Sequence, residues 1–320
     1  MENNLNNPKQ TSERTVADEE IDLRELFTAI WQGRWIVIAV TTLFAVASVF
    51  YAINEPNIYK SEALLAPAEE QQNGGLGALA GQFGGLAGFA GVDLGGGATN
   101  KTQLALEVLK SRQFTNDFIQ KYNILPDLMA VESWDLTTNT VKYDPEIYNE
   151  KTNAWVRKIE PPKKSKPSMQ EAFKEFNKLI LVDTDTDKES GMIRLSVEHE
   201  SPAIAQQWVT WLVEDINQVM KTRDVAEANK STEFLTKQLE QTNIADIRTV
   251  LYKLVEEQTK TIMFANVRDE YAFKIIDPAI VPEQKFKPKR TLICILGVLL
   301  GVVLSVMIIL IKHFIRKDNY

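Results

Sequence analysis

The sequence predicts an α+β domain between two transmembrane helices, in which a small sheet near the membrane carries a long projecting helical hairpin. Two uncharged apolar runs, at 35–53 and 291–311, are each long enough to cross a bilayer core of about 30 Å as helices. The region 54–290 between them has ordinary globular composition and contains strand-like alternation on either side of one very long helical pattern. We therefore expect two spans and one large domain.

Buried core helices and a cleaved signal peptide would also produce apolar runs, but both fit this sequence less well. Core helices rarely stay uncharged on every face over such a length. A signal peptide is suggested by Ala45-Val46-Ala47, which resembles a cleavage site. However, signal peptides begin short and basic, whereas the residues before Trp35 are numerous and rich in Asp and Glu. Both runs are therefore expected to be permanent spans.

The charges beside the spans predict which side of the membrane the domain faces. Basic residues near the first span lie mainly before it, which favours a cytoplasmic N-terminus. A basic cluster at 285–290 before the second span favours the opposite orientation. Because the first span usually dominates, we expect 1–34 and 312–320 to be cytoplasmic and the domain at 54–290 to face the outer side of the membrane.

An amphipathic helix is expected just before the first span. In Glu20–Trp31 the apolar residues Leu23, Leu26, Phe27 and Ile30 recur at helical spacing. Such a helix buries its apolar stripe at a membrane interface. It would lead the cytoplasmic segment into the bilayer.

The first half of the domain combines one strand, one helix and an irregular stretch. We expect a strand over 59–66 and a helix over 102–122. Prolines interrupt 129–167, where a short helix around 146–156 is the only regular element expected. Three lysines between these prolines suit a solvated loop better than contact with an anionic polymer, although both remain open. These lysines are Lys163, Lys164 and Lys166.

The second half supplies a β-hairpin and a long helical hairpin. Ser168 with Glu171 forms a capping-box signature, and strands at 179–186 and 192–198 follow. Long helices occupy about 202–267 and turn almost wholly polar midway, so they leave the core and project into solvent. A last strand, Tyr271 to Ile276, completes the sheet. A thin hairpin cannot cover its own apolar positions, which favours packing against other copies of the chain.

A glycine-rich loop at 73–97 holds eleven of the chain's 15 glycines. It lacks the strand directly before it that a dinucleotide-binding turn requires, and no Gly-Lys pair exists for a phosphate-binding P-loop. Its apolar residues instead recur three and four apart, with glycines between them that permit close approach of backbones. We expect a packing loop between subunits or against lipid headgroups, with a flexible linker as the alternative. The packing residues are Leu76, Leu79, Phe83 and Leu86.

No catalytic, cofactor or metal site is expected. His199 and His313 have no accompanying nucleophile pattern, and Cys294 lies inside a predicted span. The run Asp183-x-Asp185-x-Asp187 departs from a calcium loop at the following glycine and at the final glutamate, and suits a solvated strand end better. A net charge of −7 lacks the basic footprint of a nucleic-acid-binding protein.

The order of these parts resembles the Wzz chain-length determinants, which are polysaccharide co-polymerases. The resemblance covers most of the chain and includes EIDLRELFTAIWQGRW, YKSEALLAP and SGMIRLSVEHESPAIAQQWVTWLVEDIN. Its most specific part is YAFKIIDPAIVPEQKFKPKR and the span that follows. There, Pro278, Pro282 and Pro288 resemble the family's proline-rich segment, and Gly297 and Gly301 its glycines in the second helix.

Both groups of residues also have a physical reason. Proline fixes φ and pushes the preceding residue to an extended conformation, which stiffens the connection between domain and membrane. Gly297, Gly301 and Ser305 share one helix face, which permits tight packing within the chain or in a larger complex.

The resemblance implies a non-enzymatic regulator in the bacterial inner membrane, with the domain at 54–290 in the periplasm. It would form a ring-like homo-oligomer and act with the Wzy polymerase on a growing polysaccharide, setting the chain length of O-antigen in lipopolysaccharide biosynthesis or of a related surface polymer. The alternative is the transmembrane adaptor of a separate tyrosine autokinase in capsule or exopolysaccharide export.

Overall fold

The computed structural model describes residues 31–68, 97–183 and 191–318, and these form two separately packed units. One unit contains the two ends of the chain, Met1–Glu55 and Lys289–Tyr320. The other unit is Pro56–Pro288. The boundaries fall where the sequence changes from apolar runs to globular composition.

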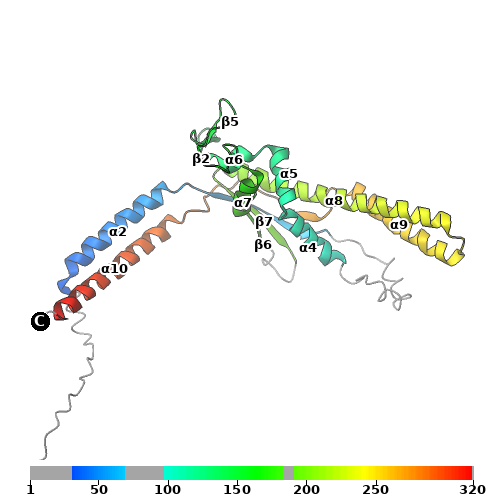
Figure 1. Ribbon diagram of the computed structural model, residues 1–320. Helices are drawn as coiled ribbons and strands as arrows, with labels where there is room; N and C mark the ends of the chain where they lie inside the picture. Colours follow the sequence, from blue (N-terminus) through cyan, green and yellow to red (C-terminus); the bar gives the residue numbers. More distant parts are fainter. Residues whose placement is uncertain (1–30, 69–96, 184–190, 319–320) are drawn as a thin grey trace, which may run out of the picture. The chain divides into compact units, whose positions relative to one another are not determined.

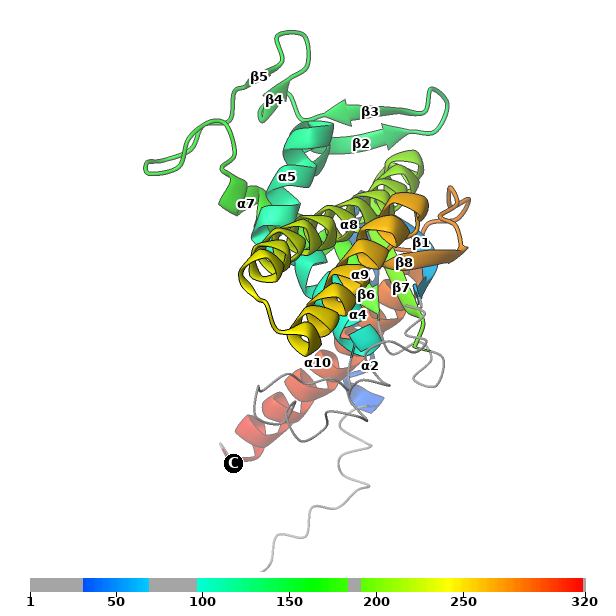
Figure 2. The same ribbon diagram turned by 90° about the vertical axis from the view of Figure 1, so that its right-hand side faces the viewer.

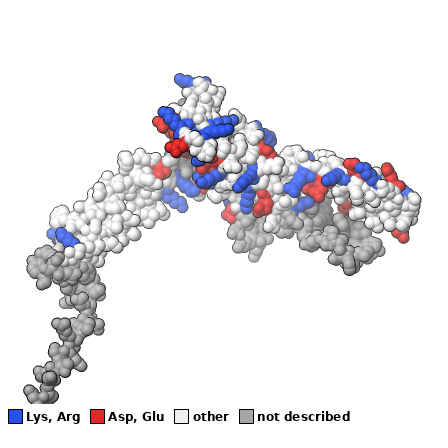
Figure 3. Space-filling view, in the orientation of Figure 1, with Lys and Arg blue, Asp and Glu red and all other residues white. Residues whose placement is uncertain are grey.

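The first unit is a pair of long helices that lie side by side (Figure 1). Helix α2 covers Arg34–Asn54 and helix α10 covers Arg290–Asp318. Both are long and apolar enough to cross a membrane, and few of their side chains are buried within the molecule. Figure 3 shows their surfaces free of charge over most of their length. Because water would have to solvate these apolar surfaces, the pair fits a two-span inner membrane protein.

The second unit is built on a four-stranded antiparallel sheet of order β6-β7-β1-β8. The strands are β1 (Tyr59–Pro67), β6 (Ile180–Asp183), β7 (Ile193–His199) and β8 (Phe273–Asp277). In the centre, β1 pairs with β7 from Tyr59↔His199 to Leu65↔Ile193. The α+β fold expected from the sequence is confirmed, and the strands next to the two spans in sequence are neighbours in the sheet.

A long helical hairpin packs on this sheet and extends beyond it (Figures 1 and 2). Helix α8 covers Pro202–Gln241 and helix α9 covers Ala245–Val267. The first half of α8 carries Trp208, the largest of the fully buried side chains described, whereas after Met220 only Ala228 is buried among its residues. The core residues of α8 are Trp208, Val209, Leu212, Val213, Ile216 and Met220. The polar middle of the helix therefore marks the point where it leaves the core, as expected.

Two shorter helices cover the core beside α8. Helix α4 (Gly97–Leu109) and helix α5 (Arg112–Tyr122) replace the single helix expected over 102–122. The break comes at Ser111, whose side chain accepts a hydrogen bond from the Phe114 N–H and caps α5. Helix α7 (Met169–Leu179) begins with the expected capping box of Ser168 and Glu171. The N-cap at Ser111 is thus the reason that two helices are present where one was expected.

The segment between α5 and α7 differs most from the expectation. Instead of a short helix around 146–156, it holds a short helix followed by two small β-hairpins. These elements are α6 (Leu125–Met129), β2 (Val131–Asp135), β3 (Thr140–Tyr143), β4 (Tyr148–Asn149) and β5 (Ala154–Trp155). Asn139 and Asn153 turn the two hairpins with positive φ of 51° and 49°. Asparagine tolerates this left-handed conformation, so each turn closes without strain.

Candidate functional site

The glycines of α10 are the points where it comes closest to α2. A Cβ atom added at Gly297 would lie 2.7 Å from the Ser48 Oγ, and one added at Gly301 would lie 2.9 Å from the Phe44 Cβ. Both distances are too short for a real side chain. Glycine is therefore required for this contact between the two helices, a geometry familiar from small-residue motifs in membrane helices.

The same interface continues to the far ends of the helices. A Cβ atom added at Gly33, just before α2, would lie 2.8 Å from the Ile309 Cγ1. Ser305 is fully buried, and its hydroxyl donates to the Val302 carbonyl at 2.7 Å. The glycine face of α10 thus packs within the chain, which is one of the two possibilities left open by the sequence.

The proline-rich segment after β8 is held by contacts that use its carbonyls. The Ser61 hydroxyl of β1 donates to the Ile280 carbonyl at 2.7 Å, and the Gln206 amide of α8 donates to the Ala279 carbonyl at 3.3 Å. A proline has no backbone N–H. At Pro278 and Pro282 the irregular segment therefore has no N–H group that would need a hydrogen-bond acceptor. The segment is therefore fixed to the domain despite having no regular structure.

A β-bridge joins the two points where the chain enters and leaves the domain. The Ile58 N–H donates to the Lys287 carbonyl at 2.9 Å, and the Ile58 carbonyl accepts from the Phe286 N–H at 2.8 Å. Ile58 follows the end of α2 by a few residues, and Lys287 precedes α10 by a few. Pro288 follows this bridge directly, so its fixed φ limits how the chain leaves it.

Two members of the basic cluster at 285–290 make local contacts. The Lys287 ammonium pairs with the buried Glu198 carboxylate at 2.6 Å. The Arg290 guanidinium donates to the Ala52 carbonyl at 2.9 Å and so satisfies a carbonyl in the last turn of α2. Because Lys287 and Arg290 make contacts within the protein, their charges are weaker evidence for the orientation of the second span in the membrane.

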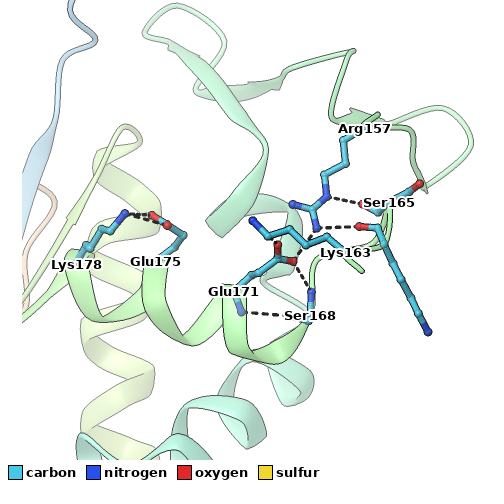
Figure 4. A network of polar contacts seen from close by, with 8 residues as sticks. Arg157, Lys163, Ser165, Ser168, Glu171, Glu175 and Lys178 are labelled. Carbon is cyan, nitrogen blue, oxygen red and sulfur yellow. Dashed lines mark hydrogen bonds and ion pairs between the residues drawn. The ribbon is translucent and has the colours of Figure 1, made fainter. Parts of the chain in front are cut away.

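The lysines between the prolines lie on an organised loop rather than a loose one (Figure 4). The Arg157 guanidinium donates to the Ser165 carbonyl at 2.7 Å, to the Lys164 carbonyl at 2.9 Å and to the Glu171 carboxylate at 2.7 Å. Glu171 also accepts from the Ser168 N–H, which completes the capping box of α7. The hydrogen bonds from Arg157 to the carbonyls of residues 164 and 165 therefore fix the backbone of this exposed loop.

The charges of this loop suit the contact with an anionic polymer that the sequence left open. Lys163 pairs with Glu171 at 3.6 Å, whereas Lys158, Lys164 and Lys166 are exposed and make no ion pair with another described residue. Figure 3 shows Lys and Arg gathered on the lobe formed by β2 to β5, with acidic residues among them. The basic character is therefore local and belongs to the loop itself.

His199 is a structural residue in this fold. The ring is buried in contact with the Trp208 ring. Its Nδ1 accepts from the Ser201 N–H at 2.9 Å, and its Nε2 donates to the Asp127 carbonyl at 3.0 Å. The ring therefore joins the end of β7 to α6. Burial lowers the pKa of His199, which keeps the ring neutral.

This geometry gives a pH prediction for His199. The unfolded chain binds a proton at about pH 6.5, whereas the folded ring resists it, so stability is lost as the pH falls through that value. Burial raises the pKa of neighbouring Glu200 to about 7, and this contribution has the opposite sign. Glu200 is present in both the wild type and His199→Gln. The difference between the two proteins therefore reports the contribution of His199 alone. We expect thermal unfolding in detergent to show a smaller loss of stability for the variant between about pH 7.5 and 5.5; equal losses would contradict the assignment.

Several predicted residues lie outside the described residues. These are the packing residues Leu76, Leu79, Phe83 and Leu86, the amphipathic helix at 20–31, and Asp185 and Asp187 of the aspartate run. Within the described part of the chain, no group of three or more His, Cys, Asp or Glu is placed to hold a metal ion.

Sequence reasoning missed a groove of about 670 Å³ between α5 and α8. Lys121 donates to Asp215 at 2.6 Å across it, and Tyr122 stacks on Trp211 with ring centroids 4.0 Å apart. Phe114, Val219 and Arg223 also line the groove. Trp211 and Asp215 are four residues apart on α8, a spacing that places two side chains on the same face of a helix. That spacing was the sequence signal that could have indicated this contact with α5.

Two family models match this chain. Residues 19–122 match the Wzz model, described as chain length determinant protein. This part of the chain is similar to the chain length determinant family. The resemblance seen in the sequence is thereby confirmed, and the match supports a role in setting polysaccharide chain length. Residues 233–314, which include α9, β8 and most of α10, match a second model, described as G-rich domain on putative tyrosine kinase.

The solved structures that resemble this chain are distant from it in sequence. A full-length bacterial polysaccharide co-polymerase is 12% identical, with a TM-score of 0.39, over 93% of this chain and 99% of that one. A fragment of WzzB, a polysaccharide co-polymerase from Salmonella Typhimurium, is 12% identical, with a TM-score of 0.30, over 72% of this chain and 100% of that one. The search of curated proteins found no match. The resemblance to chain length determinants therefore rests on the match of residues 19–122 to the Wzz model.

Proposed function

We propose that the protein sets the chain length of a surface polysaccharide, O-antigen or a related polymer, as a homo-oligomer acting with a Wzy-type polymerase. The observation that carries the proposal is the Wzz match over the first span and β1, in a chain whose two apolar helices flank one α+β domain. A protein with this plan can hold a large domain beside a membrane-embedded polymerase. The regulator would then act by positioning and contact, without chemistry of its own.

The proposed orientation places both termini in the cytoplasm and residues 54–290 in the periplasm, where the polymer grows. The lysine loop at 158–166 would meet acidic sugars or phosphates of the polymer, because its exposed ammonium groups attract anions. The exposed apolar residues of α9 and the loop residues Leu76, Leu79, Phe83 and Leu86 would pack against other copies of the chain.

The orientation has a direct test. Cysteine is introduced by Ser165→Cys or Lys317→Cys in a Cys294→Ala background, and intact spheroplasts are treated with a membrane-impermeant thiol reagent. We expect labelling at position 165, which is exposed on the lysine loop, and labelling at 317 only after the membrane is opened. The reverse pattern would overturn the proposed orientation.

Deletion of the gene tests the function itself. We expect the surface polysaccharide to persist but to lose its preferred length, because a polymerase without a regulator releases chains of broadly distributed size. The measurement is the size profile of the extracted polymer on a gel, with the intact gene restored as the control. An unchanged profile would contradict the proposal.

A second candidate function is favoured by the match to the G-rich domain on putative tyrosine kinase. In this case the protein would be the membrane adaptor of a separate tyrosine autokinase in capsule or exopolysaccharide export. Deletion would then lower the amount of exported polymer and the tyrosine phosphorylation of the kinase, while leaving O-antigen length unchanged. Phosphotyrosine blotting beside the size profile separates the two functions.

A further inference from the structure

A surface of the domain close in sequence to α10 combines exposed apolar side chains with basic ones. Ile280 is 71% exposed, Val281 is 51% exposed and Phe286 is 40% exposed. Lys285 is exposed and makes no ion pair with another described residue, and Lys287 lies beside it. Isolated apolar side chains are common on protein surfaces, but several in one short segment with lysines indicate a partner. We call these five residues the juxtamembrane surface.

The backbone of this surface is fixed, although its side chains are exposed. Ser61, itself only 2% exposed, donates to the Ile280 carbonyl, and the bridge between Ile58 and Lys287 holds the other end. Two ammonium groups lie over the Phe286 ring, with the Lys60 Nζ 5.2 Å and the Lys287 Nζ 5.4 Å from its centroid. A fixed array of this kind can bind without first being ordered.

The covalent chain limits the distance between this surface and the bilayer. Each extended residue spans at most about 3.6 Å, so Phe286 lies within roughly 15 Å of the first residue of α10. Ile58 is likewise within roughly 15 Å of the end of α2. The headgroup layer extends about 5–8 Å beyond each side of the hydrocarbon core. Both ends of the bridge are therefore confined to the headgroups or the first layer of water beside them.

We propose that the juxtamembrane surface binds the lipid headgroup layer of the membrane that α10 enters. Ile280, Val281 and Phe286 pack among the lipid headgroups, and the Lys285 ammonium contacts lipid phosphates. Aromatic and basic residues are the side chains that favour this layer, because each combines an apolar body with a polar or charged end. Lys285 of the basic cluster at 285–290 is then explained by lipid phosphates on the domain's own side, whereas Lys287 and Arg290 make the local contacts described above. The inference rests on the membrane placement given under Proposed function.

The test uses the full-length protein in liposomes that contain lipids with a nitroxide quencher near the headgroup. A bimane fluorophore is attached to one introduced cysteine at a time in the Cys294→Ala background. The three positions are Ile280→Cys, Phe234→Cys and Val303→Cys. Phe234, on α8, is 61% exposed and serves as the matched control, and Val303 lies within the proposed span.

We expect the lipid quencher to act several-fold more strongly at position 280 than at 234, and we expect the charge reversal Lys285→Glu to reduce quenching at 280. The matched control Lys253→Glu, an exposed lysine of α9, should leave quenching at 280 unchanged. Equal quenching at 280 and 234 would overturn the proposal. Shielding of position 280 from iodide without lipid quenching would also overturn it, because a second protein copy would then cover the surface. Loss of lipid quenching at 303, read with acyl-chain nitroxides, would instead contradict the membrane placement.

Discussion

Replacing Gly297 and Gly301 together by leucine is expected to separate α10 from α2 and to abolish normal length control. The added side chains would occupy space now held by Ser48, Phe44 and the backbone at Thr41. A membrane interface of this kind depends on close van der Waals contact and cannot be restored by small shifts. The measurements are the amount of protein in the membrane, its resistance to protease and the polysaccharide size profile at matched protein levels.

The control for this pair is Val302→Leu with Val303→Leu, which introduces the same two leucines at exposed positions of the same helix. Equal effects of the two double variants would show that the glycine face has no special role. A compensating change identifies the contact: Gly297→Ala introduces a methyl group that meets Ser48, and Ser48→Gly removes the atoms that it meets. Rescue of Gly297→Ala by Ser48→Gly would identify Ser48 as the residue that Gly297 must approach closely.

Asn217→Ala is expected to lower the free energy of unfolding by about 3 kcal/mol, which corresponds to a fall in Tm on the order of 10 °C. The Asn217 Oδ1 accepts from the N–H groups of Ala272 and Phe273 at 2.7 and 2.9 Å, and its Nδ2 donates to the Phe273 carbonyl at 3.0 Å. The side chain is only 5% exposed, so its loss leaves backbone groups buried without partners. These bonds attach the start of β8 to α8.

Thermal unfolding of the detergent-solubilised protein provides the measurement for Asn217→Ala. The next residue supplies the control, because Gln218 is exposed and its amide bonds only to Thr222 on the same helix. We expect Gln218→Ala to change Tm little. A similar Tm for both variants would mean that β8 is held in place without Asn217.

The parts of the fold that the sequence predicts well are those with strong local patterns. The two spans, the capping box at Ser168 and the polar exit of α8 each depend on residues near one another in the chain. The hairpins from β2 to β5 were missed because their strands are too short for alternation to be visible. A local signal was nevertheless present, since each turn contains a Thr-Asn pair whose asparagine, Asn139 or Asn153, takes the left-handed conformation.

The candidate site was only partly predictable for a different reason. The sequence identifies Gly297 and Gly301 by their spacing, but nothing local shows that Ser48 and Phe44 lie opposite them. Asn217 is one polar residue in a long helix, and its role exists only because β8 follows much later in the chain. Likewise, the residues between Arg157 and Glu171 give no sign that the two side chains meet. Contacts made across the chain require the folded structure.

The sheet order β6-β7-β1-β8 has a consequence for the biogenesis of the protein. Strand β1 is made early, but β7 begins only at Ile193 and β8 only at Phe273. At synthesis rates of about 5–20 residues per second, β1 waits on the order of ten seconds with both edges unpaired. Exposed strand edges invite aggregation and proteolysis, and pairings between distant segments form slowly. The nascent chain therefore passes through a vulnerable interval, and envelope proteases and holding chaperones should influence how much of it matures.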